Sequence, residues 1–377
     1  MNDVFVTGYG IFTAHGFGTD ALRDGVFAGE HAFGPVDRFD TTPFRGKHAA
    51  AFPGEAPGQL AALRRVSEAA LEMAGAGSDK AGVFVGTQGD HLPVQRFWRD
   101  GETAGVDHSV PARLAELLAQ ELAQTGPRIA FVNACVASAN AILHAARLIQ
   151  RGKLDVAVCA GAYLVERESF ANFDSGRAFA KDGRIRPFSG TRSGLLLGDG
   201  AAALVLESAD RVRARGGEPL ARVAGWGMAS DAYHVCQPDP EGKGLTAAIE
   251  GALRRSGKAP SDIGYINAHG TGTKINDSTE TVALHKVLGS AAPSIPISST
   301  KSTTGHMLEG AGAVEAVISL LALRDGVLPP TAGYDVADPA CDLDWIPNAP
   351  REQSVRTVLS VNAAFGGLNT AILLERP

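Results

Sequence analysis

The hydrophobic residues of this chain gather in short runs that are typical of buried β-strands, and several of these runs end abruptly at polar or glycine-rich turns. One run ends at Cys135, and an alanine-rich stretch with helical periodicity follows it over residues 136–147. A second run ends in the loop that carries His269, and a third ends in the turn that carries Lys301 and His306. Because strands alternate with helical stretches, the pattern predicts an α/β protein whose reactive side chains lie at strand ends.

The same order of elements occurs twice along the chain. Residues 5–10 have a counterpart in residues 222–227, and the strand–turn–helix around Cys135 has one around His306. A charged segment that ends in a Gly/Pro turn, residues 210–219, separates the two copies. At 377 residues the chain also exceeds the usual size of one compact core. We therefore expect two duplicated α/β halves, an N-terminal half over residues 1–215 and a C-terminal half over residues 216–377.

Composition and charge argue against several classes of partner and ligand. The net charge of −6 disfavours a nucleic-acid partner, which requires a basic face. The four cysteines, at positions 135, 159, 236 and 341, have neither the spacing of a metal site nor that of a disulfide framework. The chain begins directly with a strand-like run, without a signal peptide, and no apolar run approaches membrane-spanning length. We expect a reduced, cytoplasmic protein that binds neither a metal ion nor a membrane.

Cys135 is the first candidate for a nucleophile. A thiol at the N-terminus of a helix lies beside backbone N–H groups that lack partners, and these favour the thiolate. A lone cysteine between a strand and a helix is more often a small buried residue that fills space. Here, however, two histidines and a lysine also follow strand ends, and such a set suits covalent acyl chemistry.

Four motifs carry a resemblance to a known family. They are Asn267–Thr271, Ser299–Ser302 with Gly305-His306, Leu197–Ala201, and Ser230–His234. Through them the chain resembles, over nearly its whole length, the β-ketoacyl-acyl-carrier-protein synthases, the condensing enzymes of fatty-acid and type II polyketide synthesis. The similarity is greatest to the elongating class, which has a Cys-His-His triad. It implies a thiolase-like fold, in which two duplicated halves form five α-β-α-β-α layers and the two small-residue helices pack back to back.

The resemblance implies a decarboxylative Claisen condensation. Cys135 would take an acyl group from a phosphopantetheine arm, and a second carrier would then bring a malonyl thioester. His269 and His306, as neutral imidazoles, would donate N–H groups to the enolate oxygen that forms when CO2 leaves. The backbone N–H groups of Cys135 and Ala363 would hold the oxyanion of the following step. No resident cofactor is implied, because the substrates travel on the phosphopantetheine of an acyl carrier protein.

Further residues are expected around this triad. Lys301 would hydrogen-bond near His306 and fix the local electric field, and an ion pair with Glu315 is the alternative interpretation of this lysine. Glu315 is too polar for its Ala/Gly-rich helix unless it is paired, so we expect it to orient the lysine loop. Asp277 and Glu280 would brace the loop of the first histidine. The expected substrate-binding residues are Thr271, Thr273 and Phe365.

The last motif departs from the family pattern. Elongating members place a Phe two residues before the Phe-Gly-Gly triplet, where it gates the acyl pocket, and this chain has Ala363 there. The loss of the ring should widen the entrance to the acyl pocket. Residues 133–138 around the nucleophile also differ from the usual family sequence. These departures favour an enzyme of a specialised polyketide or polyene pathway over the primary fatty-acid elongase.

Three other functions compete with condensation. An acyltransferase on the same fold would use Cys135 and one histidine to move an acyl group to another acceptor without forming a carbon–carbon bond. A non-catalytic partner subunit would typically lack the nucleophile, and a cysteine hydrolase would need an acid to orient its histidine. The presence of Cys135 with both histidines favours condensation.

The resemblance also implies protein partners. One is an acyl carrier protein, for which the sequence offers Arg64 with Arg65, or Arg184 with Arg186, as candidate docking residues. The other is a second chain, either in a homodimer or in a heterodimer with a ketosynthase-like subunit.

Overall fold

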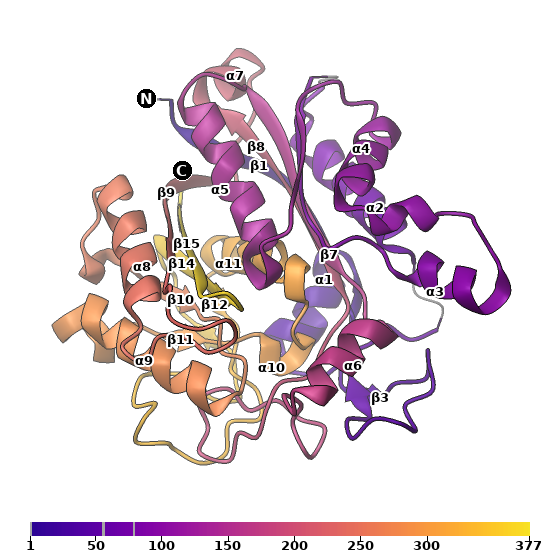
Figure 1. Cartoon of the computed structure of the whole chain (residues 1–377). Coiled ribbons are helices and arrows are strands. Elements are labelled where there is room, and N and C mark those ends of the chain that lie inside the picture. Colours follow the sequence, from indigo (N-terminus) through magenta and orange to yellow (C-terminus); the bar gives the residue numbers. More distant parts are fainter. Residues whose placement is uncertain (1, 55–56, 78–79) are drawn as a thin grey trace.

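The structure is a computed structural model that describes every residue except 1, 55–56 and 78–79, and one mixed sheet runs through the molecule (Figure 1). β1 (Val4–Thr13) and β9 (Ala221–Ser230) meet in its middle through the antiparallel pairs Phe5–Arg222 and Val6–Ala221. Outward from β1 the strands are β8 (Gly200–Ser208), β7 (Val156–Tyr163), β5 (Gly82–Gly86) and β6 (Arg128–Phe131). Outward from β9 they are β15 (Leu368–Glu375), β14 (Thr357–Ala364), β10 (Tyr265–Asn267) and β11 (Ile297–Ser298).

The two sides of the sheet share one strand order. On each side the second strand, β8 or β15, is antiparallel to both of its neighbours, and the three outer strands are parallel to one another. This correspondence pairs β1 with β9 and β6 with β11, as a duplicated α/β unit would. We propose that the boundary between the two units lies at residues 215 and 216.

Helices cover the sheet in three layers, which gives five layers in all (Figure 1). α5 (Ala137–Gln150) and α11 (Ala311–Asp325) lie between the two halves of the sheet. α2 (Gln59–Ala74) and α4 (Pro111–Glu121) cover the outer face of the first half, and α8 (Lys243–Ser256), with α9 (Lys274–Leu288) beside it, covers that of the second. This is the α/β architecture that the sequence predicts.

The two central helices approach each other very closely. Every residue of α11 from 311 to 323 is buried, and a Cβ atom added to Gly312 would lie only 2.6 Å from the backbone nitrogen of Ala139 in α5. The N–H of Ala313 donates to Ser138 Oγ at 2.9 Å. Small side chains permit this contact, which explains why both helices are so rich in Ala, Gly and Ser.

Two charged segments with few strand-like runs, residues 88–111 and 172–193, contain helices. Residues 88–111 include α3 (Leu92–Asp100), which begins with Pro93 in its first turn and ends at Gly101 in a left-handed conformation. α3 is only 9 residues long, which is shorter than the stretch over which helical periodicity is recognised in a sequence. α6 (Arg167–Ser175) likewise extends into the segment 172–193.

The remaining elements are short. They are α1 (Gly18–Leu22), a π-helix (Arg23–Phe27), α7 (Ala209–Ala214), α10 (Lys301–Thr304), 3₁₀ turns over Val106–Ser109, Ala134–Val136, Pro260–Asp262, Gly289–Ser294 and Leu308–Gly310, and the strands β2 (Gly16–Phe17), β3 (Gly34–Pro35), β4 (His48–Ala49), β12 (Val327–Leu328) and β13 (Arg351–Glu352). Within the described part of the chain, no helix is both long and apolar enough to span a membrane.

Candidate active site

Cys135 lies in the single 3₁₀ turn that connects the end of β6 to the start of α5. Its neighbour Ala134 has a φ of +49°, a left-handed conformation that side chains rarely adopt, and the chain turns sharply from strand to helix there. The cysteine is buried, with 6% of its surface exposed. The nucleophile candidate therefore precedes the helix N-terminus by one strained turn.

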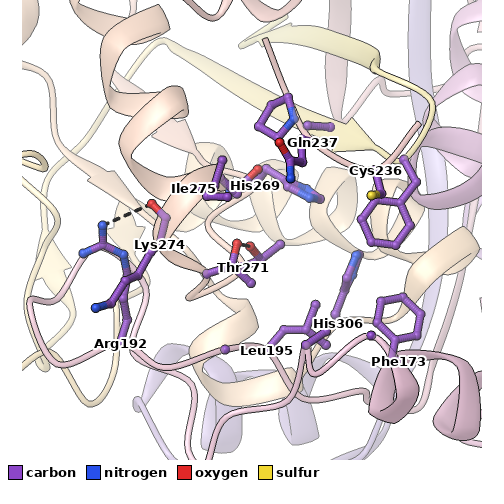
Figure 2. Close-up of a pocket in the computed structure, with 18 of the residues that line it drawn as sticks. Phe173, Arg192, Leu195, Cys236, Gln237, His269, Thr271, Lys274, Ile275 and His306 are labelled. Carbon is purple, nitrogen blue, oxygen red and sulfur yellow. Dashed lines mark hydrogen bonds between the residues drawn. The ribbon is translucent and has the colours of Figure 1, made fainter. Parts of the chain in front are cut away.

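Two imidazoles lie next to this thiol. Nε2 of His306 is 3.2 Å from Sγ of Cys135, and the ring centroids of His306 and His269 are 5.4 Å apart. Nδ1 of each ring is buried with no hydrogen-bond partner among the described residues, which leaves Nε2 as the nitrogen that serves the site. Figure 2 shows both rings in one cavity. The sequence predicts activation of the thiol by the helix N-terminus, and the structure adds this direct contact with His306.

A motif of the first half positions His306. The His306 N–H donates to the carbonyl of Leu196 at 2.8 Å, and the Gly198 N–H donates to the carbonyl of His306 at 3.1 Å. A Cβ atom on Gly198 would lie 1.9 Å from the carbonyl oxygen of Thr304, so only glycine permits this approach. The Leu197–Ala201 motif thus fixes a histidine that belongs to the other half of the chain.

Burial keeps both imidazoles neutral. Desolvation, together with the charge of Lys301, lowers the pKa of His269 and the pKa of His306 well below the ordinary value. Burial also raises the pKa of the Cys135 thiol to about 12, the charge of Glu309 adds to this rise, and the charge of Lys301 opposes it. Burial therefore opposes the thiolate that the helix terminus favours.

Lys301 belongs to a buried polar network behind the histidines. Its Nζ is paired with Oε1 of Glu315, and neither side chain has exposed surface. The other carboxylate oxygen of Glu315 accepts a hydrogen bond from Nδ2 of Asn362 in β14. The ion pair that the sequence left as an alternative for Lys301 is thus present, and it ties α10 to α11 and β14.

Two further carboxylates brace loops of the site. Glu280 in α9 accepts hydrogen bonds from the N–H groups of His269 and Gly270, at 2.7 and 2.8 Å. Oδ2 of Asp277 accepts a hydrogen bond from the N–H of Phe188 at 2.8 Å and lies 3.6 Å from Nε of Arg192. Both carboxylates are buried and accept hydrogen bonds from backbone N–H groups. Glu280 therefore holds the loop of His269, and Asp277 holds the segment around Phe188.

Cys135 lines two cavities that differ in size and composition. The larger, of about 980 Å³, is also lined by both histidines, by Ala363, and by the predicted substrate residues Thr271 and Thr273, whose hydroxyls are 2.9 Å apart. Arg192 and Lys274 lie at the end of this cavity away from His306 and Phe173 (Figure 2). The smaller cavity, of about 320 Å³, is lined by neither histidine of the triad.

Two stacked phenylalanines line both cavities. The ring of Phe365, which is half exposed, lies over that of Phe173 in α6 with 5.8 Å between the centroids. Ala363, where the family pattern has a ring, lines the larger cavity only. Phe173 and Phe365 therefore both lie where the two cavities meet at Cys135, and Phe365 is the one that the sequence assigned as a substrate-binding residue.

Sequence reasoning missed Glu309, which is 8% exposed and lines the smaller cavity next to Cys135. A signal was available, because a glutamate three residues after His306 interrupts an otherwise small and apolar turn. Glu166 in the same cavity was missed as well, since it follows β7 without any recognisable motif.

Comparison with known proteins shows the family of the chain. Residues 56–211 match the "Beta-ketoacyl synthase, N-terminal domain" and residues 220–335 match the "Beta-ketoacyl synthase, C-terminal domain". The chain is 34% identical to the tetracenomycin polyketide synthase ketoacyl synthase alpha subunit of Streptomyces glaucescens, covering 99% of this chain and 97% of that protein. It is also 34% identical to 3-oxoacyl-[acyl-carrier-protein] synthase 2 of Synechocystis, covering 99% and 98%.

Solved structures give the same result. The ishigamide ketosynthase/chain length factor superposes with a TM-score of 0.92 at 31% identity, covering 100% of this chain and 99% of that chain. A beta-ketoacyl synthase from Burkholderia phymatum superposes with a TM-score of 0.91 at 30% identity, with full coverage of both chains. The fold is thus that of the thiolase-like condensing enzymes. The chain belongs to the β-ketoacyl synthase family and is an acyl-transferring enzyme of the 3-oxoacyl-[acyl-carrier-protein] synthase type.

Proposed function

We propose that this chain carries out the decarboxylative condensation through Cys135, His269 and His306, and that it does so in a specialised polyketide or fatty-acid-like pathway. The contact that supports the proposal most directly is the 3.2 Å approach of His306 Nε2 to Cys135 Sγ, with His269 in the same cavity. The departures at Ala363 and around the nucleophile support the specialised pathway.

In the loading step, Cys135 attacks the carbonyl carbon of an acyl thioester. A new carbon–sulfur bond forms to Sγ, the bond to the pantetheine sulfur breaks, and the thiol proton ends on the departing sulfur. His306 with its proton on Nε2 donates to the developing thiolate, which offsets part of the penalty that burial places on that charge. The same tautomer is the one that the next step requires.

In the decarboxylation step, a malonyl thioester enters the larger cavity and loses CO2. The electron pair of the broken carbon–carbon bond is delocalised as an enolate. The enolate oxygen accepts hydrogen bonds from the N–H groups of His269 and His306. Their depressed pKa values keep both rings neutral, so they donate hydrogen bonds without forming an ion pair with sulfur. Lys301 supplies positive charge behind the rings while Glu315 holds it in place.

In the bond-forming step, the enolate carbon attacks the acyl carbonyl on Cys135. The carbon–sulfur bond to Sγ breaks, and a β-ketoacyl thioester leaves on the carrier. Backbone N–H groups of Cys135 and Ala363 hold the oxyanion in the intermediate, a role for Ala363 that its place on the wall of the larger cavity supports.

The larger cavity is the proposed channel for the phosphopantetheine arm. Thr271 and Thr273 would hydrogen-bond its amides, and the exposed bases Arg177, Lys181 and Lys274 on the same wall favour its phosphate and an acidic carrier protein. Of the docking residues that the sequence offers, Arg64 lies near Glu68 and Glu121, the Arg65 guanidinium stacks on Phe17, and Arg186 pairs with Asp182. Arg184 is exposed.

A second chain is the other proposed partner. The similar structures are titled as a ketosynthase with a chain length factor in the ishigamide case, and as a ketosynthase in complex with its chain length factor from Xenorhabdus doucetiae. We infer that this chain pairs either with itself or with such a ketosynthase-like subunit. The exposed Trp98, 80% accessible on α3, supports an interface on that side.

Intact-protein mass spectrometry tests the proposal. The enzyme is mixed with acyl-carrier thioesters, and malonyl-carrier is then added. An acyl mass on Cys135 that discharges as a β-ketoacyl-carrier is expected, and Cys135→Ala should take up no acyl group. Cys236→Ala is the matched control, because Cys236 is the other thiol that lines the larger cavity. An acyl group that ignores malonyl-carrier but moves to another acceptor would instead support an acyltransferase.

A further inference from the structure

The smaller cavity offers space for an acyl chain that is attached to Cys135. Both histidines line the larger cavity, which must therefore be free to receive the malonyl thioester while the acyl group waits on sulfur. Cys135 lines a second space of about 320 Å³, and an acyl chain bound to Sγ can extend into it. The side chains of that space therefore select the acyl group, an argument that rests on the proposed function.

Glu309 presents a free carboxylate to this cavity. It lies in the 3₁₀ turn before α11, is only 8% exposed, and lines the cavity together with Cys135. Its carboxylate contacts its own backbone N–H, and no other described residue hydrogen-bonds or ion-pairs with it. A buried carboxylate without a partner is costly, so its position calls for a donor from outside the chain.

The neighbouring hydroxyls leave Glu166 with spare acceptor capacity. Ser169 Oγ donates to Oε1 of Glu166 at 3.1 Å, and because its proton is used there, it accepts from the Tyr163 hydroxyl at 2.9 Å. Glu166 thus receives one hydrogen bond, whereas a carboxylate can accept about four. Glu309 and Glu166 therefore both keep acceptor positions that no donor of the described residues fills.

The ionisable side chains that line the cavity are mostly acidic. Three glutamates, Glu166, Glu168 and Glu309, line it, whereas no lysine or arginine of the described residues does so. Arg167, next in sequence to Glu166, places its guanidinium over the ring of Phe44 instead. Burial raises the pKa of Glu309 to about 7 and, with the charge of Glu168, the pKa of Glu166 to about 8. A cation in the cavity would relieve this penalty.

We propose that the acyl group carried by Cys135 bears an ammonium group, which the carboxylates of Glu309 and Glu166 bind in the smaller cavity. An ammonium supplies three donors and one positive charge, which matches a wall of acidic side chains with unfilled acceptor positions and would favour their ionised forms. A saturated alkyl chain would leave these carboxylates desolvated and unpaired, and a chain ending in a carboxylate would be repelled. The preferred substrates are therefore aminoacyl thioesters.

The test compares pantetheine thioesters in isosteric pairs. The pairs are 3-aminopropanoyl with butanoyl and 6-aminohexanoyl with heptanoyl, in which an ammonium replaces a terminal methyl group. The rate at which Cys135 gains each acyl mass is followed by intact-protein mass spectrometry. In at least one pair we expect the amino member to load about tenfold faster or more, since hydrogen bonds to a charged group are strong.

Two variants probe the carboxylates themselves. In Glu309→Gln the amino-to-methyl rate ratio should fall to about one, and Glu166→Gln should lower it in the same direction. The ratio is insensitive to the amount of folded protein, so a poorly folding variant still gives a valid answer. Glu250→Gln is the matched control, because this exposed glutamate of α8 lies outside the site and should leave the ratio unchanged.

Other outcomes overturn the inference in distinguishable ways. If the methyl members load as fast as or faster than the amino members in both pairs, the cavity does not select a cation, whereas the condensing role of Cys135 stands. If no thioester loads Cys135, including those on the carrier protein, the proposed function fails and this inference fails with it. A preference for the amino chain that survives Glu309→Gln and Glu166→Gln would mean that another group binds the ammonium.

Discussion

Lys301 and Glu315 form an ion pair from which solvent is fully excluded. Neither side chain has exposed surface, and Asn362 donates to the second carboxylate oxygen of Glu315. A buried charge is tolerated only when it is paired, so each partner depends on the other. The pair also stands directly behind the two histidines and lowers their pKa values through the charge of Lys301.

Removing one partner of this pair should destabilise the protein strongly. Lys301→Met leaves the Glu315 carboxylate buried without its cation, and the free energy of unfolding in urea should fall by about 3–5 kcal/mol. The double variant Lys301→Met/Glu315→Leu should recover part of that loss. Arg254→Ala, which breaks an exposed pair with Glu250, is the control and should cost about 0–1 kcal/mol. If Lys301→Met and Arg254→Ala lowered the free energy of unfolding equally, burial of the Lys301–Glu315 pair would not matter for stability.

The histidines should matter more for decarboxylation than for loading. Removal of one N–H donor from a developing oxyanion typically slows a reaction by about 10²–10³-fold. His269→Ala and His306→Ala should therefore slow CO2 release from malonyl-carrier by about that factor, while acylation of Cys135 falls less. Single-turnover measurements of each half-reaction separate the two effects. Equal losses in both half-reactions would assign the histidines a different role.

Glu309 should make stability depend on pH. Its pKa is raised to about 7 in the folded protein from an ordinary value of 4.5, so between these values the folded state holds a proton that the unfolded state has lost. The stabilising effect of this proton is fully present below about pH 4.5 and disappears as the pH rises through 7. Relative to Glu309→Gln, the parent chain should lose about 3 kcal/mol of unfolding free energy by pH 8. Chemical unfolding of both proteins between pH 4.5 and 8 measures this, and a difference that stays constant with pH would refute it.

Phe365 and Ala363 should have separable effects on substrate choice. Phe365→Ala removes a ring that lines both cavities, so the range of acyl chains that load Cys135 should broaden. Ala363→Phe places a ring in the larger cavity, so it should chiefly weaken use of the carrier-bound thioester. It should narrow the range of acyl chains that load Cys135 only if its ring reaches the place where the two cavities meet. Competition among acyl thioesters of different length distinguishes the two. An unchanged acyl range in Phe365→Ala would remove the junction argument.

Much of the site follows from local patterns in the sequence. Cys135, His269 and His306 each follow a short apolar run, and in a duplicated α/β unit such strand ends come together at the sheet edge. The small residues after Cys135 and around Gly312 likewise indicate two helices in close contact, as the structure has them. In these places local pattern and tertiary structure impose the same requirement.

Other features depend on contacts that no local pattern encodes. The partner of Lys301 lies 14 residues away across a turn, and the sequence alone offered it only as an alternative. The burial of Glu309 follows from the packing of its turn against the end of β7. Ala363 and Phe365 lie at the hairpin between β14 and β15, and the pairing register of these strands decides which cavity each side chain faces. A shift of that register by one residue would exchange the two faces of the strand.

The contact between Gly312 and Ala139 ties the geometry of the reaction to the backbone. Cys135 and His306 come just before the two helices that meet there, and the bond from Ala313 N–H to Ser138 Oγ fixes one helix against the other. The separation of sulfur and imidazole is therefore set by the crossing of two main chains, and no side-chain rearrangement can restore it once that crossing opens. The substitution Gly312→Ala would push α11 away from α5 and so move His306 away from Cys135. It would impair turnover well before the protein lost its fold.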